Sequence, residues 1–129
     1  MDASEGDDMT RMEQRKQWIL SDLKKMKVGL GATKRAGSDS YPFYVASMVL
    51  TTKNRYVIGM YEADSHFEKD WTMGSLVVDK FDKDKKPEFW LTPWRNAWYR
   101  CDQNGELLVP HRKDWYAFGY ASSYQDPSF

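Results

Sequence analysis

The residues best suited to chemistry are the imidazole and carboxylates of the segment His66-Phe-Glu68-Lys-Asp70. On a strand these side chains would share one side of the sheet, and together with His111 they could hold a divalent metal ion. The segment reads as a polar connection, however, and no further nitrogen ligand lies close by in the sequence. We therefore favour a solvated loop and expect no metal site. A small metal-dependent hydrolase that uses His66, Glu68 and His111 is the least favoured of three functions.

Two other stretches that could do chemistry also favour a structural interpretation. The glycines of Gly29–Lys34 suggest a phosphate-binding loop, but the flanking strand and helix that such a loop needs are not predicted there. Cys101 lies beside Arg100, a charge that could lower the pKa of a thiol. A lone cysteine is more often a small apolar filler of the core. We therefore predict no catalytic residue and no cofactor.

The aromatic residues carry more information than these stretches do. They make up 16% of the chain, and residues 88–99 contain three of its six tryptophans. Arginines lie among them, and this mixture is typical both of protein-interface hot spots and of surfaces that stack single-stranded nucleic acids. The other interpretation is that most of the rings fill the core. The partner-binding residues that the mixture predicts are Trp94, Arg95, Trp90, Arg100, Arg112 and Trp115.

The charge is balanced overall but unevenly placed. The chain has 19 basic and 19 acidic residues, so no global attraction draws it to nucleic acids or membranes. Residues 1–10 hold four acids and no base, whereas residues 11–35 hold eight bases against two acids. The balance favours a protein partner. The residues that could contact an anion are Lys24, Lys25, Lys27, Lys34 and Arg35.

The N-terminal part predicts a tail followed by a helix. Residues 1–9 are acidic and small, which is typical of a flexible tail. Thr10 and Glu13 have the spacing of a capping box, so we expect a helix from Thr10 to about Lys27. Met12, Ile19, Leu23 and Met26 fall on one face of that helix. This face should pack on the rest of the protein.

The remainder predicts short strands and turns. Residues 29–40 are rich in glycine and bases and predict a flexible loop. Asn104-Gly105 is the strongest hairpin signal in the chain. Strands are predicted at residues 41–51, 55–62, 72–81, 89–91, 98–101, 106–109 and 115–122, with a tail from residue 123. Since no helix separates these strands, parallel crossovers are not expected.

These elements predict an α+β fold. An N-terminal helix packs on a curved antiparallel meander of six to seven short strands, and residues 10–129 form a single domain. A small closed β-barrel is the main variant of this prediction.

Pro93 leads to a specific expectation for the tryptophan-rich stretch. Proline is tolerated in sheets mainly at edges and bulges. We therefore expect the strand to break there, so that residues 94–97 turn outward. Trp94 and Arg95 should then lie at the surface, while Trp90 and Trp98 point inward.

Together these features predict a non-catalytic binding protein. A protein partner is favoured, with the chain acting as an inhibitor or adaptor, and a single-stranded nucleic-acid-binding protein is the alternative. The lone cysteine fits a reducing compartment, and the acidic start and short apolar runs fit a soluble cytoplasmic protein. A viral or mobile-element origin is a hypothesis from small size and lack of motifs. The partner's identity and the oligomeric state stay open.

Overall fold

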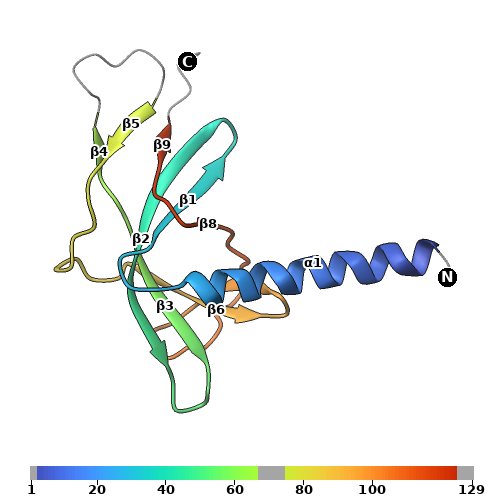
Figure 1. Ribbon diagram of the computed structural model, residues 1–129. Helices are drawn as coiled ribbons and strands as arrows, with labels where there is room; N and C mark the ends of the chain where they lie inside the picture. Colours follow the sequence, from blue (N-terminus) through green and yellow to red (C-terminus); the bar gives the residue numbers. More distant parts are fainter. Residues whose placement is uncertain (1–2, 67–74, 125–129) are drawn as a thin grey trace.

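A computed structural model describes residues 3–66 and 75–124 and shows one helix followed by an antiparallel sheet (Figure 1). This arrangement confirms the predicted α+β class with an N-terminal helix packed on the sheet. The elements in chain order are α1 (Ala3–Lys25), β1 (Gly31–Ala36), β2 (Asp39–Leu50), β3 (Tyr56–Glu62), β4 (Ser65–His66), β5 (Ser75–Val78), β6 (Phe89–Trp94), β7 (Ala97–Cys101), β8 (Ala117–Phe118) and β9 (Ser123–Tyr124).

The sheet is open, so the closed-barrel variant of the prediction is wrong. Its strands follow the order β4-β5-β9-β2-β3-β6-β7, and β1 pairs with β2 and β8 off this path. In the described part of the chain no pairing joins β4 to β7. The described residues form nine strands, more than the six to seven predicted, because several are only two residues long. Pairs of this length leave no alternating pattern in a sequence.

The first strand corrects the prediction of a flexible loop at residues 29–40. Gly31–Ala36 pairs along its whole length with β2, from Gly31 opposite Tyr44 to Ala36 opposite Asp39. Gly31 is required here, because a Cβ atom on it would lie 2.5 Å from the backbone nitrogen of Ala121. The glycine therefore marks a close approach of two backbones rather than a loop.

The helix begins earlier than the capping box predicted. It starts at Ala3, so Thr10 lies inside α1 and is not its N-cap, and the acidic residues 3–9 belong to the helix. Acidic residues suit the positive end of the helix dipole, and Lys24 and Lys25 suit the negative end. The boundary of a single domain at residue 10 stays a prediction.

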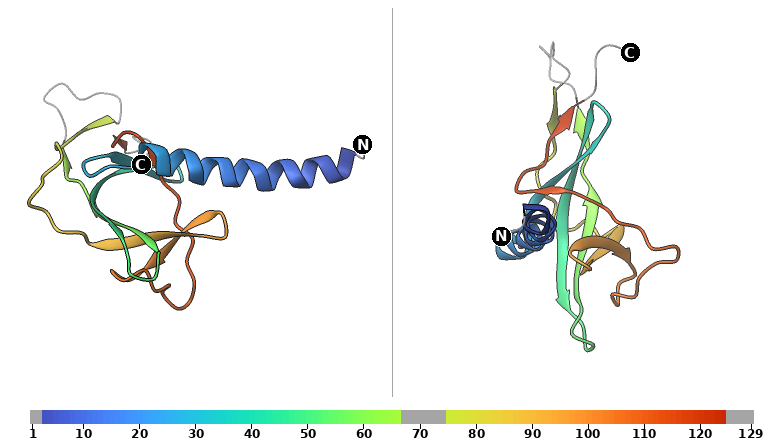
Figure 2. Two further views of the ribbon diagram at one scale, coloured as in Figure 1. Left: turned by 60° about the horizontal axis from the view of Figure 1, so that its bottom comes forward. Right: turned by 90° about the vertical axis from the view of Figure 1, so that its right-hand side faces the viewer.

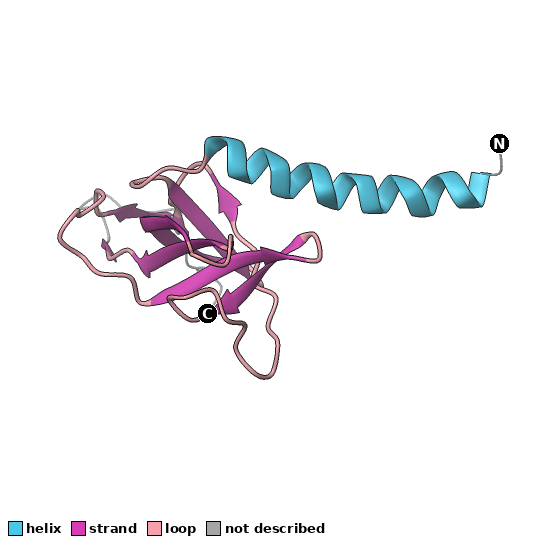
Figure 3. Ribbon diagram, turned by 90° about the horizontal axis from the view of Figure 1, so that it is seen from below, coloured by secondary structure: helices cyan, strands magenta, loops and turns pink. Residues whose placement is uncertain are grey.

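Among the described side chains of α1, which start at Arg11, those that pack on the sheet lie in its C-terminal part. Ile19 and Met26 are buried and Leu23 packs against the core, but Met12 on the same stripe is 65% exposed. Figures 2 and 3 show the N-terminal half of the helix running clear of the sheet. The indole nitrogen of Trp98 donates a hydrogen bond of 3.0 Å to the Asp22 carboxylate, which ties the helix to β7. Burial raises the pKa of Asp22, while this hydrogen bond and the charge of Lys25 oppose the rise.

The core lies between the helix and the sheet. Val45, Ile58, Met60, Leu91 and Trp98 are fully buried at its centre. Aromatic rings complete it, with Phe43 meeting both Phe89 and Tyr116 edge-on at centroid distances of 5.7 and 5.1 Å. The inward orientation predicted for Trp98 is therefore confirmed.

Pro93 does not break its strand, and Trp90 therefore does not share a face with Trp98 as predicted. β6 continues through Pro93, which lies opposite Trp98 in β7. The pairing of β6 with β3 ends at Leu91, so Pro93 has a ladder neighbour on one side only, where proline is tolerated. Side chains alternate along an unbroken strand, which places Trp90 on the same face as Trp94 and opposite to Trp98. Trp90 is half-buried.

We predict that Trp98→Ala lowers the free energy of unfolding by about 3–5 kcal/mol, as truncation of a core aromatic does. The matched control is Trp18→Ala, because Trp18 is 57% exposed and its loss should cost less than about 1 kcal/mol. Chemical denaturation of both variants measures the difference. Equal stability losses would contradict the placement of Trp98 at the centre of the core.

Candidate partner-binding surface

A buried carboxylate positions the residues around the candidate surface. Asp114 is 4% exposed and accepts hydrogen bonds from three side chains on different parts of the chain. Lys34 of β1 reaches one oxygen, while the Arg100 side chain of β7 and the Tyr116 hydroxyl reach the other at 2.6 and 2.7 Å. Burial alone would raise the pKa of Asp114, but these hydrogen bonds and the charge of Arg100 hold it below its ordinary value. The carboxylate is therefore ionised and fully engaged.

This network engages one predicted partner-binding residue, Arg100, and one predicted anion-contacting residue, Lys34. The Arg100 guanidinium lies 3.8 Å from the centre of the Phe89 ring as well as on Asp114. Lys34 lies 5.5 Å from the Tyr116 ring and is paired with Asp114. Both side chains are committed to structural contacts, so we do not place them on the binding surface.

Aromatic and basic side chains gather at the β6–β7 hairpin, and we call this group the hairpin cluster: Trp94, Arg95, Tyr99 and His111. Arg95 and His111 are exposed and Tyr99 is buried. Its turn is made by Arg95 and Asn96, both with positive φ, at 48° and 59°. A two-residue turn of this kind matches the twist of the flanking strands. The sequence prediction that residues 94–97 turn is thus confirmed, although the turn is a hairpin end and not a bulge.

The rings of the hairpin cluster support one another. The Trp94 ring meets Tyr99 and His111 edge-on at centroid distances of 4.9 and 5.0 Å. The Arg95 guanidinium lies 4.3 Å from the centre of the Trp94 ring. Trp94 is half-buried and Arg95 is exposed. These contacts therefore hold the Trp94 indole in one orientation in the free protein.

The hairpin cluster borders an open apolar groove of about 380 Å³. Pro93, Trp94, Tyr56 and Leu107 contribute to its lining, together with Leu23 of the helix. The remaining lining residues are Asn54, Arg55, Thr92 and Gly105. Close by in the chain, Val109 is 89% exposed. The groove can accept apolar side chains beside a cation and a fixed indole.

A second groove lies along the helix and contains another predicted residue, Trp115. Its lining is Trp18, Ser21, Asp22, Lys25, Trp115, Tyr116 and Ala117. Trp18 and Trp115 are 57% and 44% exposed. We call it the tryptophan groove. It brings Trp115 together with Lys25, one of the predicted anion-contacting residues.

The other predicted residues lie apart from both grooves. Lys24, Lys27, Arg35 and Arg112 are exposed but line neither groove, and Trp90 likewise contributes to neither lining. The predicted set is thus divided among the hairpin cluster, the tryptophan groove, the Asp114 network and separate surface positions.

Sequence reasoning missed His111 and Tyr99 as members of the hairpin cluster. They meet Trp94 because the chain turns at residues 102–105 and runs back along β7, with bridges at Cys101–Leu107 and Tyr99–Lys113. The Asn104-Gly105 signal predicts that return. The same signal could therefore have placed residues 107–113 beside the tryptophan-rich stretch.

The structure separates the residues of the hydrolase hypothesis. His66 lies in β4, where its Nδ1 is 3.4 Å from Asp79, while His111 packs on Trp94 near the opposite end of the sheet. Glu68 and Asp70 lie outside the described residues. Within residues 3–66 and 75–124, no group of three or more potential ligands is placed to hold a metal ion.

The Cys101 thiol is not a nucleophile at neutral pH. It is buried, and desolvation, with a smaller contribution from Asp102, raises its pKa to about 12. Arg100 donates to Asp114 instead of stabilising a thiolate. Cys101 thus has the apolar role that the sequence favoured.

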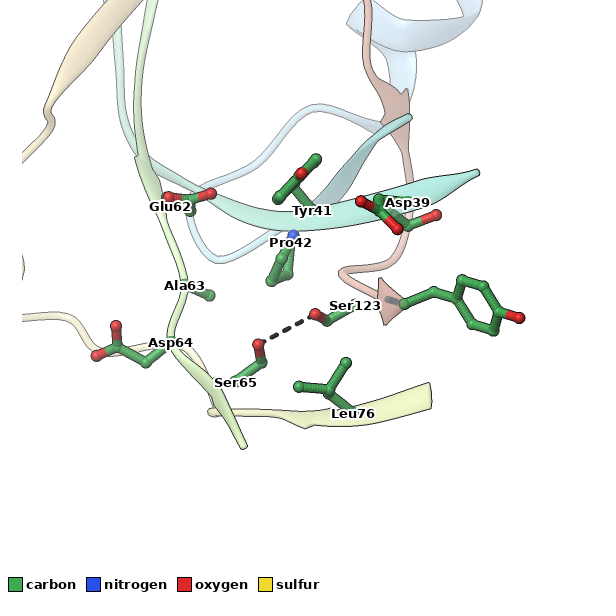
Figure 4. A pocket seen from close by; sticks show the side chains of 11 residues that line it. Asp39, Tyr41, Pro42, Glu62, Ala63, Asp64, Ser65, Leu76 and Ser123 are labelled. Carbon is green, nitrogen blue, oxygen red and sulfur yellow. Dashed lines mark hydrogen bonds between the residues drawn. The ribbon is translucent and has the colours of Figure 1, made fainter. Parts of the chain in front are cut away.

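A third hollow is lined by carboxylates (Figure 4). Asp39, Glu62 and Asp64 contribute to its lining, and the hydroxyls of Ser65 and Ser123 are joined by a hydrogen bond of 3.0 Å. Asp64 is paired with Lys85 at 3.1 Å. These acids would repel a phosphate, so this hollow is not an anion site.

No protein-family model, curated protein or solved structure matches the chain. Across the residues that the structure describes, no helix has both the length and the apolar character needed to cross a bilayer.

We predict that the stability contributed by Asp114 is lost in acid. Because its folded pKa is lowered, the contribution is present above the ordinary value of 3.8 and falls as pH drops through the folded pKa. Asp114→Asn should lose about 3 kcal/mol at neutral pH, the lower end for a broken buried pair, since Lys34 is partly solvated. The difference from wild type should shrink in acid.

Denaturant unfolding from neutral pH to pH 2 measures this convergence, with Glu106→Gln as control. Glu106 is an exposed carboxylate paired with Lys53, so its loss should have little effect. If the difference in unfolding free energy between wild type and Asp114→Asn were the same at every pH, the ion network would be contradicted.

Proposed function

We propose that this protein is a non-catalytic binding protein whose hairpin cluster and apolar groove engage another protein. The observation that carries the proposal is the Trp94 indole, held between Tyr99, His111 and Arg95 at the mouth of an open groove. Tryptophan, tyrosine and arginine dominate protein-interface hot spots, which lie in well-packed pockets rimmed by less important contacts.

The rigidity of the hairpin cluster supports this use. Each side chain that is ordered only on binding costs affinity, at about 0.5–1.5 kcal/mol. Trp94 meets two rings edge-on and one guanidinium face-on, so much of its ordering is complete in the free protein. The exposed Arg95 adds a fixed cation, which favours a partner that presents a carboxylate beside an apolar side chain.

An inhibitor or adaptor is the role we propose, because the surface offers recognition and the described residues offer no reactive group. A cytoplasmic location accords with the buried, protonated Cys101. A viral or mobile-element origin stays a hypothesis that no feature of the fold supports. We do not propose the hydrolase, because His66 and His111 do not meet.

Single-stranded nucleic acid is the second candidate, and the tryptophan groove favours it. Two exposed indoles beside Lys25, with Lys24 and Lys27 exposed nearby, could stack bases and follow phosphates. The balanced net charge argues against this candidate, since it supplies no long-range attraction to a polyanion.

We predict that Trp94→Ala and Arg95→Asn each weaken binding of the partner by about 2 kcal/mol, the threshold of a hot spot. Asparagine tolerates the positive φ of residue 95, so Arg95→Asn removes the cation without straining the turn. Capture from a lysate of the source cells and mass spectrometry would identify the partner, and titration with the purified partner would measure affinity. Trp115→Ala, in the other groove, is the matched control.

The same titrations should include a labelled single-stranded oligonucleotide at low salt. If Trp115→Ala abolishes binding while Trp94→Ala has no effect, the tryptophan groove is the functional surface. Nucleic-acid binding would then show a log–log salt slope near −0.7 per neutralised phosphate, reduced by charge reversal at Lys24, Lys25 and Lys27. The protein-partner proposal predicts no measurable binding of the oligonucleotide.

A further inference from the structure

The projecting half of α1 is a surface that the rest of the fold leaves uncovered. Residues 11–18 are all exposed, and Ile19, the next residue, is buried. The ribbon of α1 extends past the sheet in Figures 1 and 3. An isolated helix of about this length is only marginally stable in water. Helices of this kind gain most of their stability from packing against another surface. We therefore expect the projecting half to be stabilised when another surface packs on it.

The sequence of α1 continues its packing stripe beyond the sheet. Ile19, Leu23 and Met26 contact the core at spacings of four and three. The same alternation of three and four extends backward through Lys16, Met12, Met9 and Glu5. This alternation has the spacing of a coiled-coil seam, with Met9 and Met12 as apolar positions and Glu5 and Lys16 as charged ones. The seam thus has one part that packs on the chain's own sheet and one part that projects.

From this pattern we propose that the projecting half of α1 pairs, antiparallel, with the same half of a second copy of this chain. With the two helices centred between Thr10 and Arg11, seam position 9 faces position 12 of the second copy, which brings methionine to methionine. Position 5 then faces position 16, which brings glutamate to lysine. The seam is complementary to itself in this one direction.

Charge excludes the other direction and supports the chosen one. In a parallel pair, each seam position faces itself, so Glu5 would oppose Glu5 and Lys16 would oppose Lys16. Beside the seam, Asp8 and Arg15 occupy equivalent heptad positions, which in an antiparallel pair bring acid to base. The acidic start and basic continuation of α1 thus match a copy running the opposite way. This arrangement also leaves the two sheets at opposite ends of the pair.

This pairing is independent of the proposed function, because none of its residues belongs to the hairpin cluster or the apolar groove. It brings the acidic residues at the start of one helix beside basic residues of the second copy. It would also present two copies of the binding surface in one particle, which strengthens binding to a partner that carries two matching sites.

Sedimentation equilibrium over a wide concentration range tests the pairing. Wild-type protein should dimerise in a concentration-dependent way, whereas Lys16→Glu and Glu5→Lys, each placing like charges across the seam twice, should raise the dimer Kd at least about tenfold. Lys24→Glu makes the same charge change on an exposed position off the seam and should leave the Kd unchanged. A 1:1 mixture of the two single variants should regain a dimer, because lysines on one chain then face glutamates on the other.

The mixture also controls for loss of helix, since both chains carry the full α1. A wild-type protein that stays monomeric at every concentration overturns the proposal. The projecting half would then be a contact surface for a different protein. Single variants that dimerise like wild type, or a mixture that does not recover, overturn the antiparallel seam.

Discussion

The buried carboxylate of Asp114 is the constraint on which the rest of this structure depends. A charge removed from water must be paired, and Asp114 is paired with Lys34 from the first strand and Arg100 from β7. Two backbone bonds accompany these pairs: Asp114 donates to the Trp98 carbonyl at 2.9 Å and Arg100 donates to the Arg112 carbonyl at 2.8 Å. Together they hold residues 112–114 against β7. That position places His111 on Trp94, so the order of the hairpin cluster follows from a buried ion pair.

The tryptophans that the structure describes divide into three environments with different consequences. Trp98 is in the core and joins the sheet to α1 through Asp22, while Trp94 is half-buried and oriented by its neighbours. Trp18 and Trp115 are exposed beside the helix. The two interpretations of the aromatic residues, core and surface, are therefore both correct for different residues. Strand alternation separates Trp94 from Trp98, whereas Trp18 lies in α1 and Trp115 lies outside the strands.

The features that were predicted correctly from the sequence are those that local interactions control. The turns at residues 52–54 and 102–105 and the burial of Trp98 follow from turn chemistry and from the position of a large ring in a paired strand. The strand at Gly31–Ala36 was missed because its glycine and basic residues resemble a loop, although the short turn at Gly37 joins it to β2 as a hairpin. Asp114 could not be predicted, since an acid between Lys113 and Trp115 gives no sign of burial. Of the candidate surface, Trp94 and Arg95 were predicted, whereas His111 required knowledge of how the chain returns along β7.

Native-state hydrogen exchange tests most directly whether the Asp114 network organises the candidate surface. The informative amides are those of Arg100 and Asp114, which bond to Arg112 and Trp98, compared with amides of the β2–β3 hairpin, such as Val57. In Asp114→Asn, we expect Arg100 and residue 114 to lose protection far more than Val57 does, with the His111 ring signals shifting as its contact with Trp94 loosens. Equal protection of these amides in the variant and the wild type would contradict the dependence of the binding surface on the buried ion pair.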